Sequence, residues 1–188
     1  MGSLHTCGAR CGTNEGPCVA LEAAETTMRV KSLIDHPPVT VGPDATVLAV
    51  TTMMREDDIG AVLVLDRNRL VGIVTDRDIA TKLTPFGAPA LAQPIARFMT
   101  LDPLTCSPDQ DVRDATVLMA DFQVRRLPVL DASGRVVGLL TLDMIAEDFC
   151  EHLAGETLGE IVEQRSRKPL RVKPEDLRAG FPVPKFRQ

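Results

Sequence analysis

The sequence predicts a mixed α/β (α+β) fold in which one unit, strand-helix-strand-strand-helix, occurs twice and the two copies pack sheet to sheet about a pseudo-twofold axis. The motif Val39–Asp44 returns as Leu104–Asp109, and the segments after each motif keep the same order and hydrophobic pattern. One copy of about 60 residues would bury only a small core. We therefore expect the two copies to cover each other's apolar sheet faces.

In each copy the shared motif predicts a first strand, and the segment after it predicts a helix. Val47–Glu56 and Val112–Asp121 place apolar residues at helical spacing. A Pro-Asp turn before each segment can cap the helix. Ile59–Leu65 and Val124–Leu130 are short apolar segments that end at an aspartate, which predicts a second strand followed by a turn.

A third strand and a second helix complete each copy. Leu70–Val74 and Val136–Leu140 are apolar, and each runs into a threonine at the predicted start of a helix. A short helical lead-in precedes each copy, at Lys31–Ile34 and at Ala96–Met99. The predicted boundaries are a flexible cysteine-containing segment at 1–27, the first copy at 28–86, a linker at 87–94, the second copy at 95–153, and a short helix with a basic, proline-containing tail at 154–188.

The composition indicates a globular, cytoplasmic protein. Of the 188 residues, 44% are hydrophobic and 25% are charged. The longest apolar run, Ile59–Leu65, is far shorter than the roughly 20 residues that cross a bilayer, and the N-terminal sequence has no signal-peptide pattern. We therefore expect no membrane contact.

Charge is unevenly distributed along the chain. The net charge is −5, yet residues 165–188 contain eight Lys or Arg and only two acids. A basic segment of this kind can contact nucleic acid or anionic lipid, but it is more often a solvated tail. We favour the solvated tail and keep a nucleic-acid contact as an alternative.

The cysteines and histidines predict neither a disulfide framework nor a metal site. Five cysteines is an odd number, which favours reduced thiols when no secretory signal is present. His5, Cys7, Cys11 and Cys18 lack the paired C-x2-C or H-x3-H spacing of zinc sites. The sequence also contains no nucleophile elbow, P-loop or H-E-x-x-H motif, so we expect a protein that is not an enzyme and requires no cofactor.

The segment Gly72–Ile79 predicts a ligand site. Its strand ends at Thr75, and Asp78 follows three residues later on the first turn of the predicted helix. The hydroxyl, the carboxylate and the free N–H groups of the helix start would face one point. A carboxylate there can accept hydrogen bonds from both hydroxyls of a ribose, and the N–H groups favour a nearby phosphate.

The doubled pattern, the Gly-x-x-Thr-x-x-Asp segment and the segment Val124–Val129 together resemble a tandem CBS-domain pair, or Bateman module, over residues 28–153. The resemblance implies that clefts between the repeats bind AMP, ADP, ATP, S-adenosylmethionine or a related adenosyl compound, and that binding regulates an attached or partner protein. It also implies a homodimer. The short chain is similar to stand-alone bacterial stress proteins of this family, such as the hypoxic response protein.

The resemblance implies roles for seven residues of the first cleft. It assigns Thr75 and Asp78 to the ribose, Val74, Leu104 and Thr105 to the adenine, and Arg125 and Arg126 to phosphate. The two arginines align with the basic pair that reaches phosphate in the gamma subunit of AMP-activated kinase. Arg77 and Lys82 are auxiliary charges that no motif fixes.

The second cleft departs from the family pattern. Its matching residues are Thr40, Gly60, Ala61, Thr141 and Asp143. Met144 stands where the ribose-binding acid belongs, and Gly60 and Ala61 stand where the arginines belong. We therefore expect one ligand-competent cleft and one degenerate cleft.

Local roles also explain the residues of the first cleft. Thr75 can be a helix cap, and Asp78 can be an acid that the helix dipole favours. Arg125 and Arg126 can be surface charges at the start of a strand that pair with Asp121 or Asp131. Two functions follow: a sensor of an adenosyl compound that modulates an unidentified partner protein, or a non-catalytic dimeric interaction or stress protein that binds no nucleotide.

Overall fold

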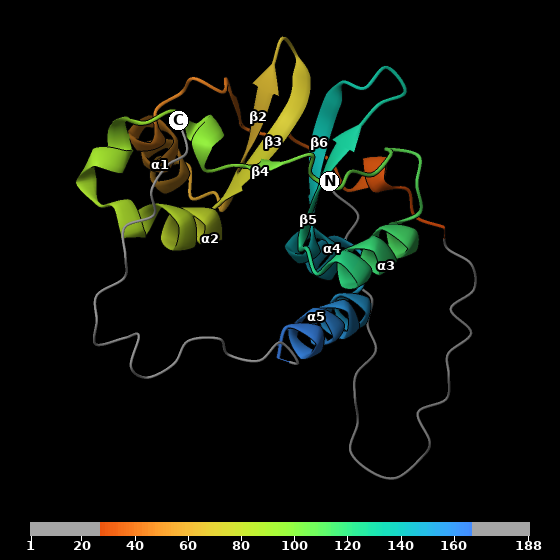
Figure 1. Cartoon of the computed structure of the whole chain (residues 1–188). Coiled ribbons are helices and arrows are strands. Elements are labelled where there is room, and N and C mark those ends of the chain that lie inside the picture. Colours follow the sequence, from red (N-terminus) through yellow and green to blue (C-terminus); the bar gives the residue numbers. More distant parts are fainter. Residues whose placement is uncertain (1–26, 167–188) are drawn as a thin grey trace.

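The computed structural model describes residues 27–166, and its elements repeat in the order that the sequence predicts (Figure 1). The first repeat contains β1 (Thr40–Val41), α1 (Val47–Glu56), β2 (Ala61–Asp66), β3 (Arg69–Thr75) and α2 (Asp76–Asp78). The second repeat contains α3 (Val112–Phe122), β5 (Arg126–Leu130), β6 (Val136–Thr141) and α4 (Leu142–Asp148), and α5 (Glu151–Ser166) follows it. The predicted mixed α/β class is confirmed.

Short helical turns connect these elements. The helix α2 continues through a π-helical turn, Ile79–Leu83, and a 3₁₀ turn, Thr84–Phe86. The predicted linker contains a further 3₁₀ turn, Ala88–Ala92. Each lead-in forms a single 3₁₀ turn, Val30–Ser32 before the first repeat and Ile95–Arg97 before the second.

The strands form one sheet in each repeat. In the first sheet the order is β1-β2-β3-β4, where β2 and β3 form an antiparallel hairpin, β1 is parallel to β2, and β4 (Thr100–Leu101) is antiparallel to β3. The second sheet is the β5–β6 hairpin. Cys106 makes an isolated parallel bridge to Val129, so the predicted first strand of the second repeat is reduced to a single pairing.

The two long helices that follow the first strands do not use the predicted Pro-Asp caps. Thr46 caps α1, and its Oγ1 accepts a hydrogen bond from Ala49 N at 3.2 Å. Asp111 caps α3, and its carboxylate accepts a hydrogen bond from Arg113 N at 2.8 Å. Both caps lie after the Pro-Asp turn, because a cap must be the last non-helical residue to reach the free N–H groups of the first turn.

A small apolar cluster joins the two repeats. Ala61, Leu63 and Ile73 of the β2–β3 hairpin are buried, and Val136 and Leu139 of β6 pack against them. The two hairpins therefore lie side by side, with α1 and α2 beside the first hairpin and α3 and α4 below the second in the view of Figure 1. This is the sheet-to-sheet arrangement that the sequence predicts.

The lead-in of each repeat packs on the other repeat. Val30 N donates a hydrogen bond to Gln110 O at 3.0 Å, and Ile95 N donates one to Ala45 O at 2.8 Å. Val30 is fully buried in the core of the second repeat, and Ile95 is fully buried in the core of the first. The two lead-ins therefore cross between the repeats and tie them together.

Two glycines make room for the crossed lead-ins. A Cβ atom on Gly72 would overlap the side chain of Met99, and a Cβ atom on Gly138 would overlap the side chain of Ile34. Met99 and Ile34 occupy matching positions just after the two 3₁₀ turns. At the glycine in the third strand of each repeat, a larger residue would therefore force the lead-in of the other repeat to shift.

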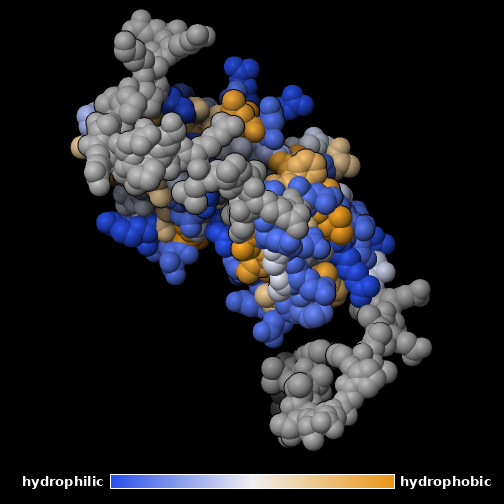
Figure 2. Space-filling model, turned by 60° about the horizontal axis from the view of Figure 1, so that its bottom comes forward, coloured by the Kyte–Doolittle hydropathy of each residue, from blue (hydrophilic) through white to orange (hydrophobic). Residues whose placement is uncertain are grey.

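The helix α5 is longer than the short helix that the sequence predicts, and it belongs to the second core. It packs on α3 and α4, and Ala154, Thr157 and Ile161 are buried at helical spacing. Leu158 and Val162 are exposed. Figure 2 shows the face that includes α5, where separate apolar patches interrupt a mostly hydrophilic surface.

Replacing Ile161 by alanine tests whether α5 is part of the second core. Ile161 is fully buried, so Ile161→Ala should lower the free energy of unfolding by about 2–5 kcal/mol in urea titrations. Leu158→Ala, on the same helix but 40% exposed, is the matched control and should change it by less than about 1 kcal/mol. Equal losses for the two variants would contradict the packing described for α5.

Candidate functional site

The candidate site begins where β3 ends and α2 starts. Thr75 caps α2: its Oγ1 accepts a hydrogen bond from Asp78 N at 3.2 Å, and Asp78 Oδ2 accepts one from Thr75 N at 3.0 Å. Thr75 Oγ1 also donates to this carboxylate oxygen at 2.7 Å. The two residues form a capping box, so the helix-cap role suggested for Thr75 is confirmed, and Asp78 takes part in the same cap. The same box holds a hydroxyl and a carboxylate side by side.

The other carboxylate oxygen of Asp78 faces a lysine and a threonine. Lys82 Nζ lies 2.8 Å from Asp78 Oδ1 and donates hydrogen bonds to Phe98 O and Thr100 Oγ1, each at 3.1 Å. Thr100 Oγ1 lies 3.5 Å from Asp78 Oδ1. Lys82, in the π-helical turn that continues α2, therefore links the first repeat to β4, which follows the lead-in of the second repeat.

The pKa of the Asp78 carboxyl is lowered from its usual value. Burial, the largest single influence, acts to raise this pKa, but hydrogen bonds from Lys82 and Thr75 and the charge of Lys82 together outweigh it. Asp78 is consequently ionised at neutral pH. An ionised carboxylate acts only as a hydrogen-bond acceptor, which suits it to hydroxyl donors.

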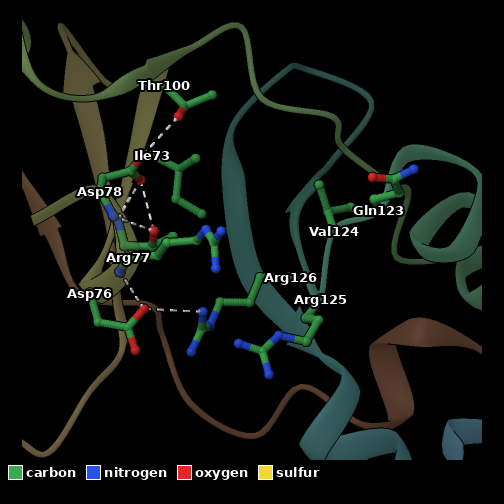
Figure 3. A pocket seen from close by; sticks show the side chains of 10 residues that line it. Ile73, Asp76, Arg77, Asp78, Thr100, Gln123, Val124, Arg125 and Arg126 are labelled. Atoms are coloured by element: carbon green, nitrogen blue, oxygen red, sulfur yellow. Dashed lines mark hydrogen bonds and ion pairs between the residues drawn. The ribbon is translucent and has the colours of Figure 1, made fainter. Parts of the chain in front are cut away.

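A cavity of about 230 Å³, hereafter cleft 1, opens beside Thr75 and Asp78 (Figure 3). The first repeat contributes Ile73, Thr75, Asp76, Arg77 and Asp78, β4 contributes Thr100, and the second repeat contributes Gln123, Val124, Arg125 and Arg126. Side chains from the two repeats face each other across this space. Thr75 and Asp78 therefore share one cavity with both arginines.

Arg125 and Arg126, the two arginines that the second repeat contributes to cleft 1, lie in different environments. Arg125 is exposed and forms no ion pair with the residues that the structure describes. Arg126 is 21% exposed, and its Nη1 lies 4.0 Å from Asp76 Oδ1. Within residues 27–166 neither arginine pairs with Asp121 or Asp131, which the local explanation of the two charges would require.

A second cavity of about 300 Å³, hereafter cleft 2, occupies the pseudo-symmetric position. Four of the five residues predicted for it line it: Gly60, Ala61, Thr141 and Asp143. Thr141 caps α4 and accepts a hydrogen bond from Met144 N at 3.2 Å. Met144 has no carboxylate that could accept a hydrogen bond from Thr141 N, as Asp78 does from Thr75 N in the first repeat. Arg126 also lines cleft 2, so this cavity has a cationic side chain that the sequence comparison of the repeats does not predict.

The residues predicted for the adenine are not brought to cleft 1. Val74 is fully buried in the first core, while its neighbour Ile73 lines the cavity, because successive side chains of a strand point to opposite faces. Leu104 packs against the second core, and neither it nor Thr105 is among the lining residues. Thr40 is exposed and does not line cleft 2.

Sequence reasoning missed Thr100 and Gln123, which line cleft 1. Thr100 pairs with Ile73 between β4 and β3, a neighbour relation that only the crossed lead-in produces. Gln123 ends α3 with a left-handed backbone, φ 57°. Gln123 directly precedes the predicted strand that carries Arg125 and Arg126, and this position in the sequence could have indicated that it lies near the site.

The structure leaves some predictions untested. The segment with His5, Cys7, Cys11 and Cys18 and nearly all of the basic tail lie outside the described residues. Within residues 27–166 no three His, Cys, Asp or Glu side chains lie close enough to hold a metal ion. No helix in this range has the length and apolar character needed to cross a membrane.

The buried cysteine of the second core is chemically protected. Burial raises the pKa of the Cys106 thiol to about 11. The thiolate is the reactive form of cysteine, and at neutral pH almost none of it is present at this position. Cys106 therefore serves as a core residue.

Comparison with known protein families identifies the repeated unit. The family model of the CBS domain matches this chain twice, at residues 30–84 and 95–150. The chain belongs to the CBS domain family. Its two CBS domains are the two repeats of the fold, and the 3₁₀ turn of each lead-in begins at the first matched residue of its domain.

Relatives of this CBS pair include short and long proteins. The CBS domain-containing protein YhcV of Bacillus subtilis is 32% identical over 136 residues, which cover 72% of this chain and 96% of YhcV. The inosine-5'-monophosphate dehydrogenase of Korarchaeum cryptofilum is 31% identical over 141 residues, 75% of this chain but 28% of the enzyme. The CBS pair therefore matches nearly all of YhcV and a minor part of the dehydrogenase.

Solved structures of CBS pairs resemble this fold. The CBS domain pair of protein MJ0100, in complex with 5'-methylthioadenosine and S-adenosyl-L-methionine, is 27% identical with a TM-score of 0.59 and covers 65% of this chain and 99% of that chain. Hypoxic Response Protein I, with two coordinated zinc ions, is 28% identical with a TM-score of 0.58 over 65% of this chain and 99% of that chain. The predicted similarity to the hypoxic response protein is confirmed.

Replacing Lys82 by methionine tests the charge balance around Asp78. Without the ammonium group the pKa of Asp78 should rise, which a carboxyl carbon NMR titration measures directly. Lys82→Met should also lower the free energy of unfolding at pH 7 by about 1 kcal/mol, since Lys82 is 41% exposed and solvent weakens the pair.

The effect of Lys82→Met on stability should depend on pH in one direction. The folded-state pKa of Asp78 is depressed, so the stabilisation is present above the ordinary value of 3.8 and is lost as pH falls through the lower folded-state pKa. The difference between wild type and variant should shrink accordingly in acid. Lys31→Met, which breaks an exposed ion pair with Asp109, is the control and should have no measurable effect. A pH-independent difference would contradict this account.

Proposed function

We propose that cleft 1 binds an adenine nucleotide or another adenosyl compound and that binding regulates a partner protein. The observation that carries the proposal is the shared cavity of Thr75, Asp78, Arg125 and Arg126. The ionised carboxylate of Asp78 would accept hydrogen bonds from the two ribose hydroxyls. The guanidinium groups would bind a phosphate, for which their planar pairs of donors are suited.

The dimensions of cleft 1 favour a ligand that is partly exposed. Its volume of about 230 Å³ is below the roughly 300–1,000 Å³ of pockets that enclose a drug-sized ligand. Asp78 lies at its buried side, with a side chain that is 14% exposed, whereas Arg125 is exposed. We infer that the ribose would bind inside and the phosphate toward the mouth.

A solved relative supports the adenosyl class of ligand. The CBS pair of MJ0100 was crystallised with 5'-methylthioadenosine and S-adenosyl-L-methionine, two compounds that share an adenosyl group. Neither carries a phosphate, while the second repeat contributes two arginines to cleft 1, Arg125 and Arg126, that would be unused with such a ligand. Among AMP, ADP, ATP and S-adenosylmethionine we therefore favour the nucleotides.

Regulation would follow from the position of cleft 1 between the repeats. A ligand that touches Asp78 and Arg125 contacts both repeats and stabilises the arrangement in which the two sides are correctly spaced. Lys82 would carry the change further, because it bonds to Asp78 and to Thr100 of β4, which directly follows the lead-in of the second repeat. A partner protein would read the resulting change at the surface, and we propose a homodimer as the unit that presents it.

Calorimetric titration of the four compounds tests the proposal, with Asp78→Ala as the key variant. Loss of the acceptor should weaken binding of AMP by about 1.5–3 kcal/mol, a tenfold to hundredfold loss in affinity. The variant also loses its capping box, so affinity and not stability is the measured quantity. Asp143→Ala in cleft 2 is the control and should keep the wild-type affinity. If none of the four compounds binds at millimolar concentration, the interaction-protein alternative replaces this proposal.

Arg125→Ala separates a ligand role from a structural one. Arg125 is exposed and forms no ion pair with the described residues, so its removal should leave the melting temperature of the free protein unchanged. The affinity for AMP should fall about tenfold to hundredfold, while the affinity for adenosine, which has no phosphate, should stay constant. An equal loss for both compounds would contradict the assignment of Arg125 to phosphate.

A further inference from the structure

Arg126 lines both cavities of the CBS pair. It is the residue that cleft 1 and cleft 2 have in common, and it lies at the first position of β5. Its guanidinium group extends from the second repeat toward Asp76 of the first (Figure 3), with 4.0 Å between Nη1 and Asp76 Oδ1. One side chain therefore borders two separate spaces.

Gly60 allows Arg126 to reach this position. A Cβ atom on Gly60 would overlap Arg126 Nη2 and would come within 3.4 Å of Asp76 Oδ2. Gly60 itself lines cleft 2 and matches Arg125 of cleft 1 in the comparison of the repeats. At the position of Gly60, cleft 2 thus has no side chain, whereas cleft 1 has Arg125 at the matching position. The guanidinium group of Arg126 lies against the backbone of Gly60.

The charges of the two cavities are unequal. Cleft 1 has three arginines, Arg77, Arg125 and Arg126, against two aspartates. Among its lining residues cleft 2 has Arg126 as its one cation, against Asp58 and Asp143. If the guanidinium of Arg126 turns fully into cleft 1, cleft 2 keeps two carboxylates, which repel an anion.

We propose that Arg126 is a specificity-determining residue shared by the two clefts, so that a phosphate-bearing ligand in cleft 1 withdraws the cation of cleft 2 and excludes a second such ligand. The proposal rests on the proposed function of cleft 1 and adds the rule that governs how many anionic ligands one chain holds. The contact with Asp76 at 4.0 Å is long for an ion pair, so a phosphate at hydrogen-bond distance is the stronger partner. A ligand in cleft 1 then changes the surroundings of Gly60, because Arg126 moves away from it, although cleft 2 holds no ligand.

The experiment is an amide NMR titration of the full chain with AMP and, separately, with adenosine. With AMP, the amide signals of Thr75 in cleft 1 and Gly60 in cleft 2 should shift along the same saturation curve, and calorimetry should give one AMP per chain. With adenosine, which has no phosphate, Thr75 should shift and Gly60 should stay in place. Arg126→Ala should abolish the shift of Gly60 and weaken AMP about tenfold, while Arg125→Ala, the matched control, should weaken AMP and keep the shift.

The outcomes separate this proposal from the function of cleft 1. A titration in which Thr75 shifts and Gly60 does not, or a stoichiometry of two AMP per chain, overturns the sharing of Arg126 and leaves cleft 1 as a nucleotide site. A Gly60 shift that survives Arg126→Ala overturns the role of this side chain in the same way. If neither signal shifts with AMP or adenosine, both the proposed function and the sharing fail. The amide of Val64, buried in the first core, reports that each variant is folded.

Discussion

The apolar contact between the two hairpins is the constraint on which both cavities depend. Leu63 and Ile73 of the first repeat are buried against Leu139 of the second, and this contact fixes how the hairpins face each other. At one end of the contact, Ala61 pairs with Thr75 across the first hairpin, and Arg126 pairs with Thr141 across the second. Apolar packing thus brings polar strand ends together that no local interaction would join.

The crossed lead-ins stabilise the contact between the two hairpins. Each lead-in inserts a fully buried residue into the core of the other repeat, so the two repeats cannot separate without exposing apolar surface in both cores. The lead-in of the second repeat is followed directly by Thr100 of β4 in cleft 1, and Lys82 bonds to both Thr100 and Asp78. The segment that connects the second repeat to the first therefore also forms part of cleft 1.

The capping box at the start of α2 shows that a local role and a ligand role do not exclude each other. Thr75 and Asp78 satisfy the free N–H groups of the helix start, and one oxygen of Asp78 remains directed to Lys82 and Thr100. In the second repeat Thr141 caps its helix without an acid, because Met144 replaces it. The threonine cap of α4 forms without an acid three residues later. A carboxylate at Asp78 is therefore not needed for a threonine to cap α2.

The sequence by itself determined the repeat, the order of its elements, the mixed α/β class and the meeting of Thr75, Asp78 and the two arginines, since each of these depends on local hydrophobic periods or on a family pattern. The tertiary structure decided which repeat each lead-in covers, that α5 completes the second core, that Ile73 and not Val74 faces cleft 1, and that Arg126 borders both clefts. These features arise from packing between segments far apart in the chain. A period of two or of 3.6 residues identifies a strand or a helix, but it does not say which distant surface that element will cover.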